Sequence, residues 1–564
     1  MNLRAAIANS LWVASSVPAW NAFRRALRGP NEVQLQLLRH YLAQNADTAW
    51  GREHQFSEIR TYTEFIQRVP LRQYDDFEPW IARIKRGEQG VLTREPVTHF
   101  IPTSGSSGAR KLVPFTAGMQ REFNRAIGPW ITDLFRGFPS LPLGSAYWSV
   151  SPAIQVSGSE PSVVPIGFED DSSYLGGSRK RLIDSVMAVP SEVRFVSDIE
   201  QFRYLTLLCL LRQSDLRLIS VWHPSFLSLL LDALPAHWQN LLDDISRGQC
   251  RYSAALAPPV LRALKRRPMP ARANYLQKAD PLSPEGVWPQ LKVISCWGDA
   301  NAELGIGDLQ RRFPTVFVQR KGLLATEAFV TIPFSGCYPL AVCSHFFEFI
   351  DDQGAVHLAS DLKESETYEV VATTAGGLCR YRLQDQVRVT GFVEKTPAFR
   401  FLGRKGNVSD RFGEKLSQAF VSQVLQQLTT NLQTTPRFAM LAPDEDSSGC
   451  CYTLYVEGAI EAKLATRLDA LLRQNPHYEW CRKLDQLRPP RVFQITADGY
   501  ETFVSREMCE GTRLGDIKPV SLSLRGGWSD HFDGRYTIAE TAPDSVFGPH
   551  SDSKFAGRPT LSEL

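Results

Sequence analysis

A run of hydroxyl and glycine residues that ends in a lysine is the stretch of this chain best suited to chemistry. It reads Thr103-Ser104-Gly105-Ser106-Ser107-Gly108-Ala109-Arg110-Lys111. Glycines let backbone N–H groups turn toward an anion, hydroxyls add hydrogen-bond donors, and a lysine adds a point charge. The run therefore predicts a loop that wraps an oligophosphate. Its nucleotide-binding candidates are Thr103, Ser104, Gly105, Ser106, Ser107, Gly108 and Lys111.

The spacing of this run differs from that of the P-loop NTPases. In the pattern G-x-x-x-x-G-K-[ST], the lysine follows a glycine directly and a hydroxyl follows the lysine. Here Ala109 and Arg110 intervene, and Leu112 follows the lysine. Without partners, a Ser/Gly run is more typical of a surface turn. The lysine, together with charged residues far downstream, favours the phosphate-binding interpretation.

A hydroxyl beside a carboxylate forms the second candidate. Thr326 and Glu327 follow a strand predicted over 315–318. Ligands of α/β sheets bind beyond the carboxyl ends of strands, and carboxylates hold magnesium because hard cations take oxygen ligands. We therefore expect Thr326 to contact a nucleotide and Glu327 to bind Mg2+. On its own, a Thr-Glu pair is more typical of a helix start.

Three more charged residues are candidates in the second half of the chain. Asp385 is expected at the start of a strand, where its carboxylate can accept bonds from both ribose hydroxyls; a solvated turn is the alternative. The glycines beside Arg404 permit backbone rotation, so we expect a hinge there. Arg404 itself is expected to contact ribose or phosphate. Lys518 is expected in a turn that Pro519 stiffens.

The elements that must position these residues change along the chain. Residues 1–95 and 198–270 carry apolar side chains at helical spacing, and 216–234 is expected to be a core helix. Alternating strands such as 346–350, 368–373 and 386–390 come later. Helices followed by strands predict an α/β fold with a mixed sheet and a barrel-like antiparallel part.

Two domains and a tail are predicted. Residues 1–400 form the large N-terminal domain, and residues 401–536 form a small α+β domain of the size of a lid. Residues 537–564 are rich in Pro, Ser, Asp and Gly and are expected to be disordered.

Composition excludes several classes of protein. The net charge is +3 and no long single-sign block occurs, which argues against a nucleic-acid or polybasic membrane role. The 10 cysteines are scattered without a C-x-x-C pair, so they indicate neither a zinc site nor a disulfide framework. We expect a cytoplasmic protein without a membrane span.

Together, and in this order, these stretches resemble the motifs of the adenylate-forming enzymes, the superfamily of firefly luciferase and the acyl-CoA synthetases. They are most similar to the auxin-responsive acyl-acid-amido synthetases, the family called Gretchen Hagen three. The family's Ser/Gly loop, Ser/Thr-Glu motif and Y-R-x-G-D motif match residues 103–111, 326–327 and 381–385. Its hinge pairs match Gly403-Arg404 and Glu414-Lys415, and its C-terminal lysine matches Lys518. The resemblance spans residues 20–530.

The resemblance implies a ligase that uses ATP and Mg2+. A carboxylic acid would become an acyl-adenylate with release of pyrophosphate, and an amine, usually of an amino acid, would displace AMP. It implies a mobile C-terminal domain in which Lys518 is the catalytic lysine of the first step, with Lys415 as the alternative. Tyr147, Trp148 and Trp297 are expected to line the acyl pocket, or else to be core aromatics. We expect a monomer.

Two departures and two alternatives accompany this interpretation. Gln384 stands where the family has glycine, and Gly406 stands where the superfamily has an acidic hinge residue. An AMP-forming acyl-CoA ligase would share the first half-reaction. A catalytically inactive nucleotide-binding relative is the other alternative, although Lys111, Glu327, Asp385 and Lys518 together argue against it. No residue selects a particular acid or amine.

Overall fold

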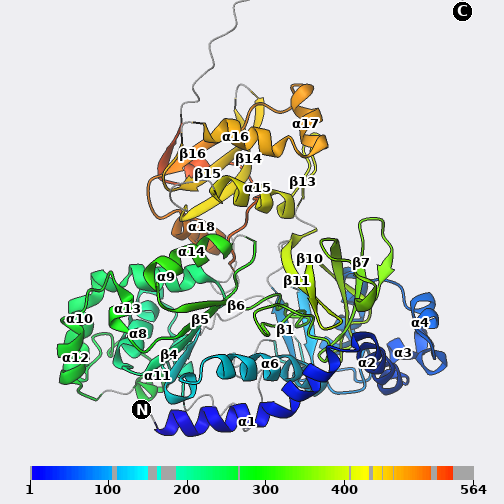
Figure 1. Ribbon diagram of the computed structural model, residues 1–564, viewed down its shortest axis with the longest axis horizontal. Helices are drawn as coiled ribbons and strands as arrows, with labels where there is room; N and C mark the ends of the chain where they lie inside the picture. The colour runs from blue at the N-terminus through cyan, green and yellow to red at the C-terminus, as the bar shows by residue number, and fades with distance from the viewer. Residues whose placement is uncertain are drawn as a thin grey trace, which may run out of the picture.

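The structure is a computed structural model with a large body and a smaller one above it (Figure 1). The large body is built from the N-terminal part of the chain, and the smaller one from the C-terminal part. The structure describes residues 3–103, 111–149, 162–166, 186–264, 267–300, 302–405, 408–430, 436–446, 449–461, 463–509 and 517–537.

The N-terminal region is helical, as its apolar spacing predicts. Its elements are α1 (Leu3–Ala26), α2 (Pro30–Asn45), α3 (Ala49–Glu53), η1 (Phe56–Glu58), α4 (Tyr62–Arg68) and α5 (Tyr74–Lys85). Thr48 and Thr61 cap α3 and α4, because each side chain accepts a bond from a backbone N–H of the first turn. Strands β1 (His99–Thr103) and β2 (Lys111–Phe115) then pair antiparallel, before α6 (Ala117–Gly137) packs along α1.

A parallel sheet forms the first core of the large body. Its strands are β3 (Ser145–Trp148), β4 (Leu216–Ser220), β5 (Val293–Cys296) and β6 (Phe317–Arg320), in that spatial order. The elements between and around these strands are η2 (Leu141–Leu143), η4 (Ser191–Phe195), α8 (Ile199–Arg212), α9 (Pro224–Asp232), α10 (Leu234–Arg247), α11 (Pro258–Ala263), α12 (Pro270–Leu276), α13 (Pro284–Val287) and α14 (Ala302–Arg312). Leu207 of α8 and Leu241 of α10 share a core with Ile219 and Ile294 of the sheet.

The prediction of a single core helix over 216–234 is wrong. Residues Leu216–Ser220 form β4 between β3 and β5, and α9 begins only at Pro224. A strand of a parallel sheet is covered on both faces, so its residues are almost all apolar. A short apolar run of this kind has the composition of a buried helix, and periodicity does not separate the two.

An antiparallel sheet forms the second core of the large body. Its strands are β7 (Phe346–Ile350), β8 (Val356–His357), β9 (Thr367–Thr373), β10 (Tyr381–Val393) and β11 (Thr396–Arg404), in the order β11-β10-β9-β7-β8, with η5 (Ala359–Asp361) after β8. Asp385 was expected at a strand start, but it lies inside β10, where the pairing with β9 is interrupted between Arg382 and Gln386. The prediction failed because the bulge leaves the strand running on both sides of it.

The smaller body is a sheet with helices, as the predicted α+β domain requires. Strands β14 (Phe438–Asp446), β15 (Gly449–Glu457), β16 (Arg491–Ile495) and β17 (Gly534–Tyr536) lie in that order. The other elements are β12 (Val408–Ser409), β13 (Leu416–Ser417), α15 (Gln418–Thr430), α16 (Leu464–Leu472), α17 (Pro476–Lys483), α18 (Gly499–Cys509) and η6 (Trp528–Asp530). A helix was expected to start at Glu414, but β13 precedes it and the helix begins at Gln418.

Helix α18 is the part of the smaller body that lies next to α9 and α14 of the larger one (Figure 1). Its residue Glu501 forms an ion pair with Arg203 of α8 at 3.2 Å. The domain limits at residues 400 and 536 stay predictions, and the predicted disordered tail, apart from residue 537, lies outside the described residues. Among the described residues, no helix is long and apolar enough to cross a membrane.

Candidate active site

Charged residues predicted from separate stretches of sequence meet beside β10. Asp385 of β10 lies opposite Arg404 of β11, and the Arg404 Nε is 3.6 Å from the Asp385 Oδ1. The Tyr381 hydroxyl donates a hydrogen bond to the Glu327 Oε1 at 3.4 Å. Glu327, Asp385 and Tyr381 are all buried. We call Glu327, Tyr381, Asp385 and Arg404 the acid–arginine cluster.

The pKa values show how strongly the members of this cluster act on one another. The pKa of Asp385 is raised to about 6, because burial and the Glu327 carboxylate raise it by more than Arg404 and Lys518 lower it. Burial acts to lower the pKa of Arg404, but Asp385 and Glu327 outweigh burial, so its pKa lies above the ordinary value. Arg404 therefore stays cationic between two carboxylates, a position suited to holding an anionic ligand that approaches them.

Lys111 joins the cluster from the start of β2. Burial and the charge of Arg404 lower its pKa, while Glu327, Asp75 and Asp385 raise it. Its Nζ lies over the Tyr74 ring, 5.7 Å from the centroid. Thr103, at the end of β1, lies opposite Lys111, so the two ends of the Ser/Gly run are held together by the β1–β2 pairing. Residues 104–110 of the run lie outside the described residues.

The backbone beside Asp385 has the conformation that a glycine would have. Gln384 has a φ of 62°, in the left-handed region, and its carbonyl accepts a bond from the Lys405 backbone N–H at 2.7 Å. Side chains other than glycine are disfavoured there. The family has glycine at this position because glycine adopts the left-handed conformation without strain. Gln384 keeps the same left-handed conformation. The other departure, at Gly406, lies outside the described residues.

Lys518 brings a positive charge of the smaller body near the cluster. Its Nζ lies 4.8 Å from the centroid of the Trp297 ring, directly after β5. Its charge lowers the pKa of Asp385, as described above, and also that of His223. Lys415 is exposed, and its backbone carbonyl accepts a bond from the Asn475 Nδ2 at 3.2 Å. In this arrangement Lys518, rather than Lys415, lies near the cluster.

Thr326 lies in the turn that also holds Glu327. The Ala325 backbone N–H donates to the Ala328 carbonyl at 3.0 Å, which closes this turn beyond β6. The Thr326 side chain is half-buried, next to the buried Glu327. Among the described residues, no group of three or more His, Cys, Asp or Glu side chains is arranged to hold a metal ion.

The three predicted acyl-pocket aromatics lie in different surroundings. Tyr147 of β3 is fully buried in the core that the parallel sheet shares with α8. Trp148 packs edge-on against Trp12 of α1, with ring centroids 5.8 Å apart. The ring centroids of Trp297 and Phe401 of β11 are 5.7 Å apart, and the Lys518 Nζ lies over the Trp297 ring. Of the three, only Trp297 is described in contact with Lys518.

His223 was missed by the sequence interpretation. It follows β4 and caps α9, because its Nδ1 accepts a bond from the Ser225 backbone N–H at 3.3 Å. Burial, with a smaller effect of Lys518, lowers its pKa to about 3, so the ring is neutral and its proton lies on Nε2. The Nε2 is buried and has no hydrogen-bond partner among the described residues. A His-Pro-Ser sequence after a buried strand was the available signal.

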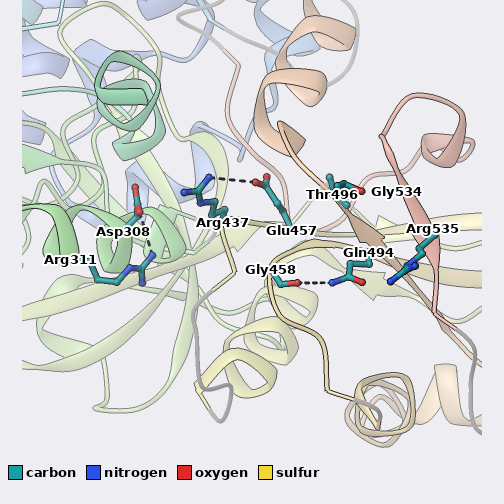
Figure 2. Close-up of a pocket in the computed structure, with 10 residues that line it drawn as sticks. Asp308, Arg311, Arg437, Glu457, Gly458, Gln494, Thr496, Gly534 and Arg535 are labelled. Carbon is teal, nitrogen blue, oxygen red and sulfur yellow. Dashed lines mark hydrogen bonds and ion pairs between the residues drawn. The ribbon is translucent and has the colours of Figure 1, made fainter. Parts of the chain in front are cut away.

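A hollow lies between the two bodies, away from these residues. It has a volume of about 960 Å3 and is lined by Asp308 and Arg311 of α14 and by residues of the smaller body. Figure 2 shows the Arg437–Glu457 ion pair on one side of it and the bond from Gln494 to the Gly458 carbonyl on the other. Charges of both signs line it, and none of the predicted site residues does.

The fold and the site define a two-domain α/β protein whose smaller domain brings a lysine to a buried cluster of carboxylates and an arginine. Three family models identify it further: the GH3 family N-terminal domain matches residues 19–317, the central domain 338–404 and the C-terminal domain 416–525. The chain belongs to the GH3 family, which confirms the resemblance described above.

Individual relatives agree with this assignment. The indole-3-acetic acid-amido synthetase GH3.5 of Arabidopsis thaliana is 26% identical over 452 residues, which cover 71% of this chain and 72% of the relative. The probable indole-3-acetic acid-amido synthetase GH3.4 of Oryza sativa subsp. japonica is 26% identical over 583 residues, covering 92% and 90%. A solved structure of the AtGH3.15 acyl acid amido synthetase in complex with 2,4-DB has a TM-score of 0.81 at 19% identity, covering 91% of this chain and 95% of that one. This likeness confirms the predicted fold class.

Proposed function

We propose that the protein is an ATP-dependent acyl-acid-amido synthetase. It activates a carboxylic acid as an acyl-adenylate and joins the acyl group to an amine, that of an amino acid. One observation carries the proposal. Lys518 of the small domain lies over the Trp297 ring, and its charge lowers the pKa of Asp385 in the acid–arginine cluster. The family membership and the names of the relatives, which are amido synthetases, support it.

The nucleotide is held by residues on both sides of β10. The Ser/Gly run and Lys111 bind the phosphates, and Asp385 accepts bonds from the ribose hydroxyls. Arg404, which is cationic and next to Asp385, contacts ribose or phosphate oxygens. Thr326, beside Glu327, adds a hydroxyl from the turn beyond β6. Burial of Asp385 strengthens its contact because the local dielectric constant is low.

Glu327 has the properties of a magnesium ligand. It is a buried carboxylate whose described hydrogen-bond partner is the hydroxyl of Tyr381, so oxygen lone pairs remain for a cation. Magnesium is commonly held by one or two carboxylates together with substrate phosphates, which fits a single protein carboxylate here. Bound there, Mg2+ would neutralise charge on the phosphates of ATP.

The first half-reaction builds charge at the α-phosphate. A carboxylate oxygen of the acid attacks the α-phosphorus of ATP, and the bond to the bridging oxygen breaks so that pyrophosphate leaves. The cationic side chains of Lys518 and Lys111 stabilise the charge that develops on the phosphoryl oxygens, because they are already in place when it forms.

The second half-reaction needs space at the acyl carbon. The amine nitrogen attacks that carbon, the bond to the AMP oxygen breaks, and the amine loses a proton. Lys518 has no task in this step, and a movement of the small domain would remove it and admit the amine. We also propose that the enzyme is a cytoplasmic monomer.

The test is an assay of the two half-reactions. Pyrophosphate exchange into ATP is measured with the wild-type protein across aryl, indolyl and fatty acids, and products formed with mixed amino acids are then identified by mass. Acid-dependent exchange with an amide product supports the proposal. Exchange followed by AMP release with CoA, and not with amino acids, would make the protein an acyl-CoA ligase. Absence of exchange across the whole panel would contradict the proposal and indicate a catalytically inactive nucleotide-binding protein.

A further inference from the structure

Helix α18 connects the small domain to the large one at two consecutive residues. The Tyr500 ring lies nearly parallel to the His223 ring, with an angle of 11° and centroids 6.2 Å apart. Glu501 forms an ion pair with Arg203 of α8 at 3.2 Å. The first turn of α18 therefore contacts both the start of α9 and the side of α8.

A polar contact accompanies the ring contact. The pKa of Tyr500 is raised to about 12 because burial raises it by more than the neighbouring Ser225 hydroxyl lowers it. The Ser225 Oγ lies 2.5 Å from the His223 Nδ1. Tyr500, Ser225 and His223 thus form one chain of side chains that crosses from the small domain to the end of β4.

Helix α18 and the neighbour of Lys518 pack in the same core of the small domain. Ile517, the neighbour of Lys518, is buried in one core with Phe503 and Val504 of α18. The start of α18 is fixed to the sheet of the small domain, since the Glu457 Oε2 accepts a bond from the Gly499 backbone N–H at 3.0 Å. Glu457 lies at the hollow between the domains, where it faces Arg437 (Figure 2). Through this shared core, a shift of α18 acts on the position of Lys518.

The far end of the chain of contacts is also tied to Lys518. His223 meets the Trp297 ring edge-on, with centroids 6.2 Å apart, and Lys518 lies over the same Trp297 ring. Tyr500 and Lys518 consequently hold the small domain against one patch of the large domain, formed by His223, Ser225 and Trp297.

We propose that Tyr500 is a positioning residue for the adenylation step. Its contacts with His223 and Ser225 hold α18 in the orientation in which Lys518 reaches Trp297 and the acid–arginine cluster. The inference rests on the function proposed above, in which Lys518 serves the first half-reaction alone. Tyr500 does not touch the reacting atoms, so its removal lowers the fraction of molecules in the adenylation arrangement and leaves the chemistry of transfer intact.

The experiment compares three variants of the full-length protein. Tyr500→Ala removes the ring and the hydroxyl, Tyr500→Phe removes the hydroxyl alone, and Ser505→Ala changes an exposed residue of the same helix as a control. We expect pyrophosphate exchange to fall about tenfold in Tyr500→Ala, because the aromatic contact with His223 and the polar contact with Ser225 are lost together. Tyr500→Phe should lose less, and Ser505→Ala nothing. Conversion of a supplied acyl-adenylate should stay within about twofold of the wild type in all three.

A double mutant identifies the contact that acts. If Tyr500 acts through Ser225, Tyr500→Phe combined with Ser225→Ala should lose no more exchange than Ser225→Ala alone. Equal losses in exchange and transfer would assign Tyr500 a merely structural role and overturn the inference, as would full exchange activity in Tyr500→Ala.

Hydrogen exchange separates this inference from the proposed function. Backbone amides of residues 517–523 and of the first turn of α9 should exchange faster in Tyr500→Ala than in Ser505→Ala, while β16 keeps its protection. If the wild type showed no pyrophosphate exchange, the proposed function would fall, and this measurement would still decide whether Tyr500 holds Lys518 in place. Unchanged protection in Tyr500→Ala would overturn the positioning role.

Discussion

The Lys518 nitrogen lies 4.8 Å from the centroid of the Trp297 ring, so a residue of the small domain covers the end of β5 in the large one. A cation over an aromatic ring at an exposed site contributes only about 0.5–1 kcal/mol. Lys518 is exposed, so this contact alone does not hold the domain in place. Such a lysine can be in the site for one step and leave it for the next.

The first prediction follows from that contact. Lys518→Ala should slow pyrophosphate exchange by about 10²–10³, because a preorganised cation is lost from a transition state that builds charge. Transfer from a supplied acyl-adenylate should continue. Lys415→Ala is the matched control, since Lys415 is exposed elsewhere in the same domain. Both half-reactions are measured in both variants, and intact exchange in Lys518→Ala with none in Lys415→Ala would reverse the two roles.

Lys111 should act on the nucleotide and not on the fold. Each charge-assisted contact contributes about 1.5–3 kcal/mol, so Lys111→Ala should raise the KM for ATP by at least tenfold. The side chain is half-buried at the start of β2, and its removal leaves the β1–β2 pairing intact. ATP kinetics and thermal unfolding are compared with the wild type. A folded variant with unchanged ATP kinetics would contradict the assignment of the Ser/Gly run.

Asp385 should make the enzyme sensitive to the ribose 2′-hydroxyl. A buried acceptor left without its partner costs about 1–3 kcal/mol, so wild-type protein should use ATP better than 2′-deoxy-ATP by about 5- to 150-fold in kcat/KM. Asp385→Ala should lose most of this preference. The check is exchange with both nucleotides in both proteins, and equal use by the wild type would exclude the ribose role.

Much of this site followed from residue chemistry alone. The charged residues Lys111, Glu327, Asp385 and Arg404, predicted from four separate stretches, lie within electrostatic reach of one another. Such residues are recognisable in the sequence because only a few types of side chain bind oligophosphates or cations. The helices of the N-terminal region followed from their apolar spacing in the same way.

What the sequence missed depended on contacts between distant segments. His223 and Tyr500 are 277 positions apart, and their contact arises only when the two domains are assembled. The run 216–234 was assigned to a helix because its local composition is that of a buried helix, while its neighbours in the sheet, β3 and β5, are remote in sequence. Neither the contact between His223 and Tyr500 nor the pairing of β4 with its neighbours can be read from the nearby sequence.

The stability of the protein should depend on pH through Asp385. Its pKa is raised from 3.8 to about 6 in the folded protein, so the native state binds the proton more tightly than the unfolded state does. The protonated carboxyl contributes stability that is fully present below about pH 4 and is lost as the pH rises through about 6. The difference of roughly two pKa units corresponds to about 3 kcal/mol.

Asp385→Asn should remove this dependence. The free energy of unfolding in urea is measured from pH 4 to pH 7 for the wild type, for Asp385→Asn and for Asp352→Asn, a control in an exposed turn. We expect the fall in stability with rising pH to be smaller in Asp385→Asn than in the other two proteins. The same slope in all three would mean that Asp385 is ionised in the folded state at every pH tested.

The last prediction concerns the strained backbone at Gln384. A residue other than glycine in the left-handed region costs roughly 1–2 kcal/mol, and a glycine in a strand costs about 0.5–1 kcal/mol in backbone entropy. At φ 62° the first cost exceeds the second, so Gln384→Gly should raise the free energy of unfolding by about 0.5–1 kcal/mol. Gln386→Gly, two residues along the same strand, should lower it by a similar amount because Gln386 is paired with Glu369 of β9 and is not in the left-handed region. The Gln384 side chain makes an exposed bond to the Gln73 Oε1 at 3.4 Å, and its loss has little effect.

Urea unfolding of both variants checks the sign of each change. Destabilisation of the same size in both would show that Gln384 is not strained, and that the family's glycine at this position is kept for another reason.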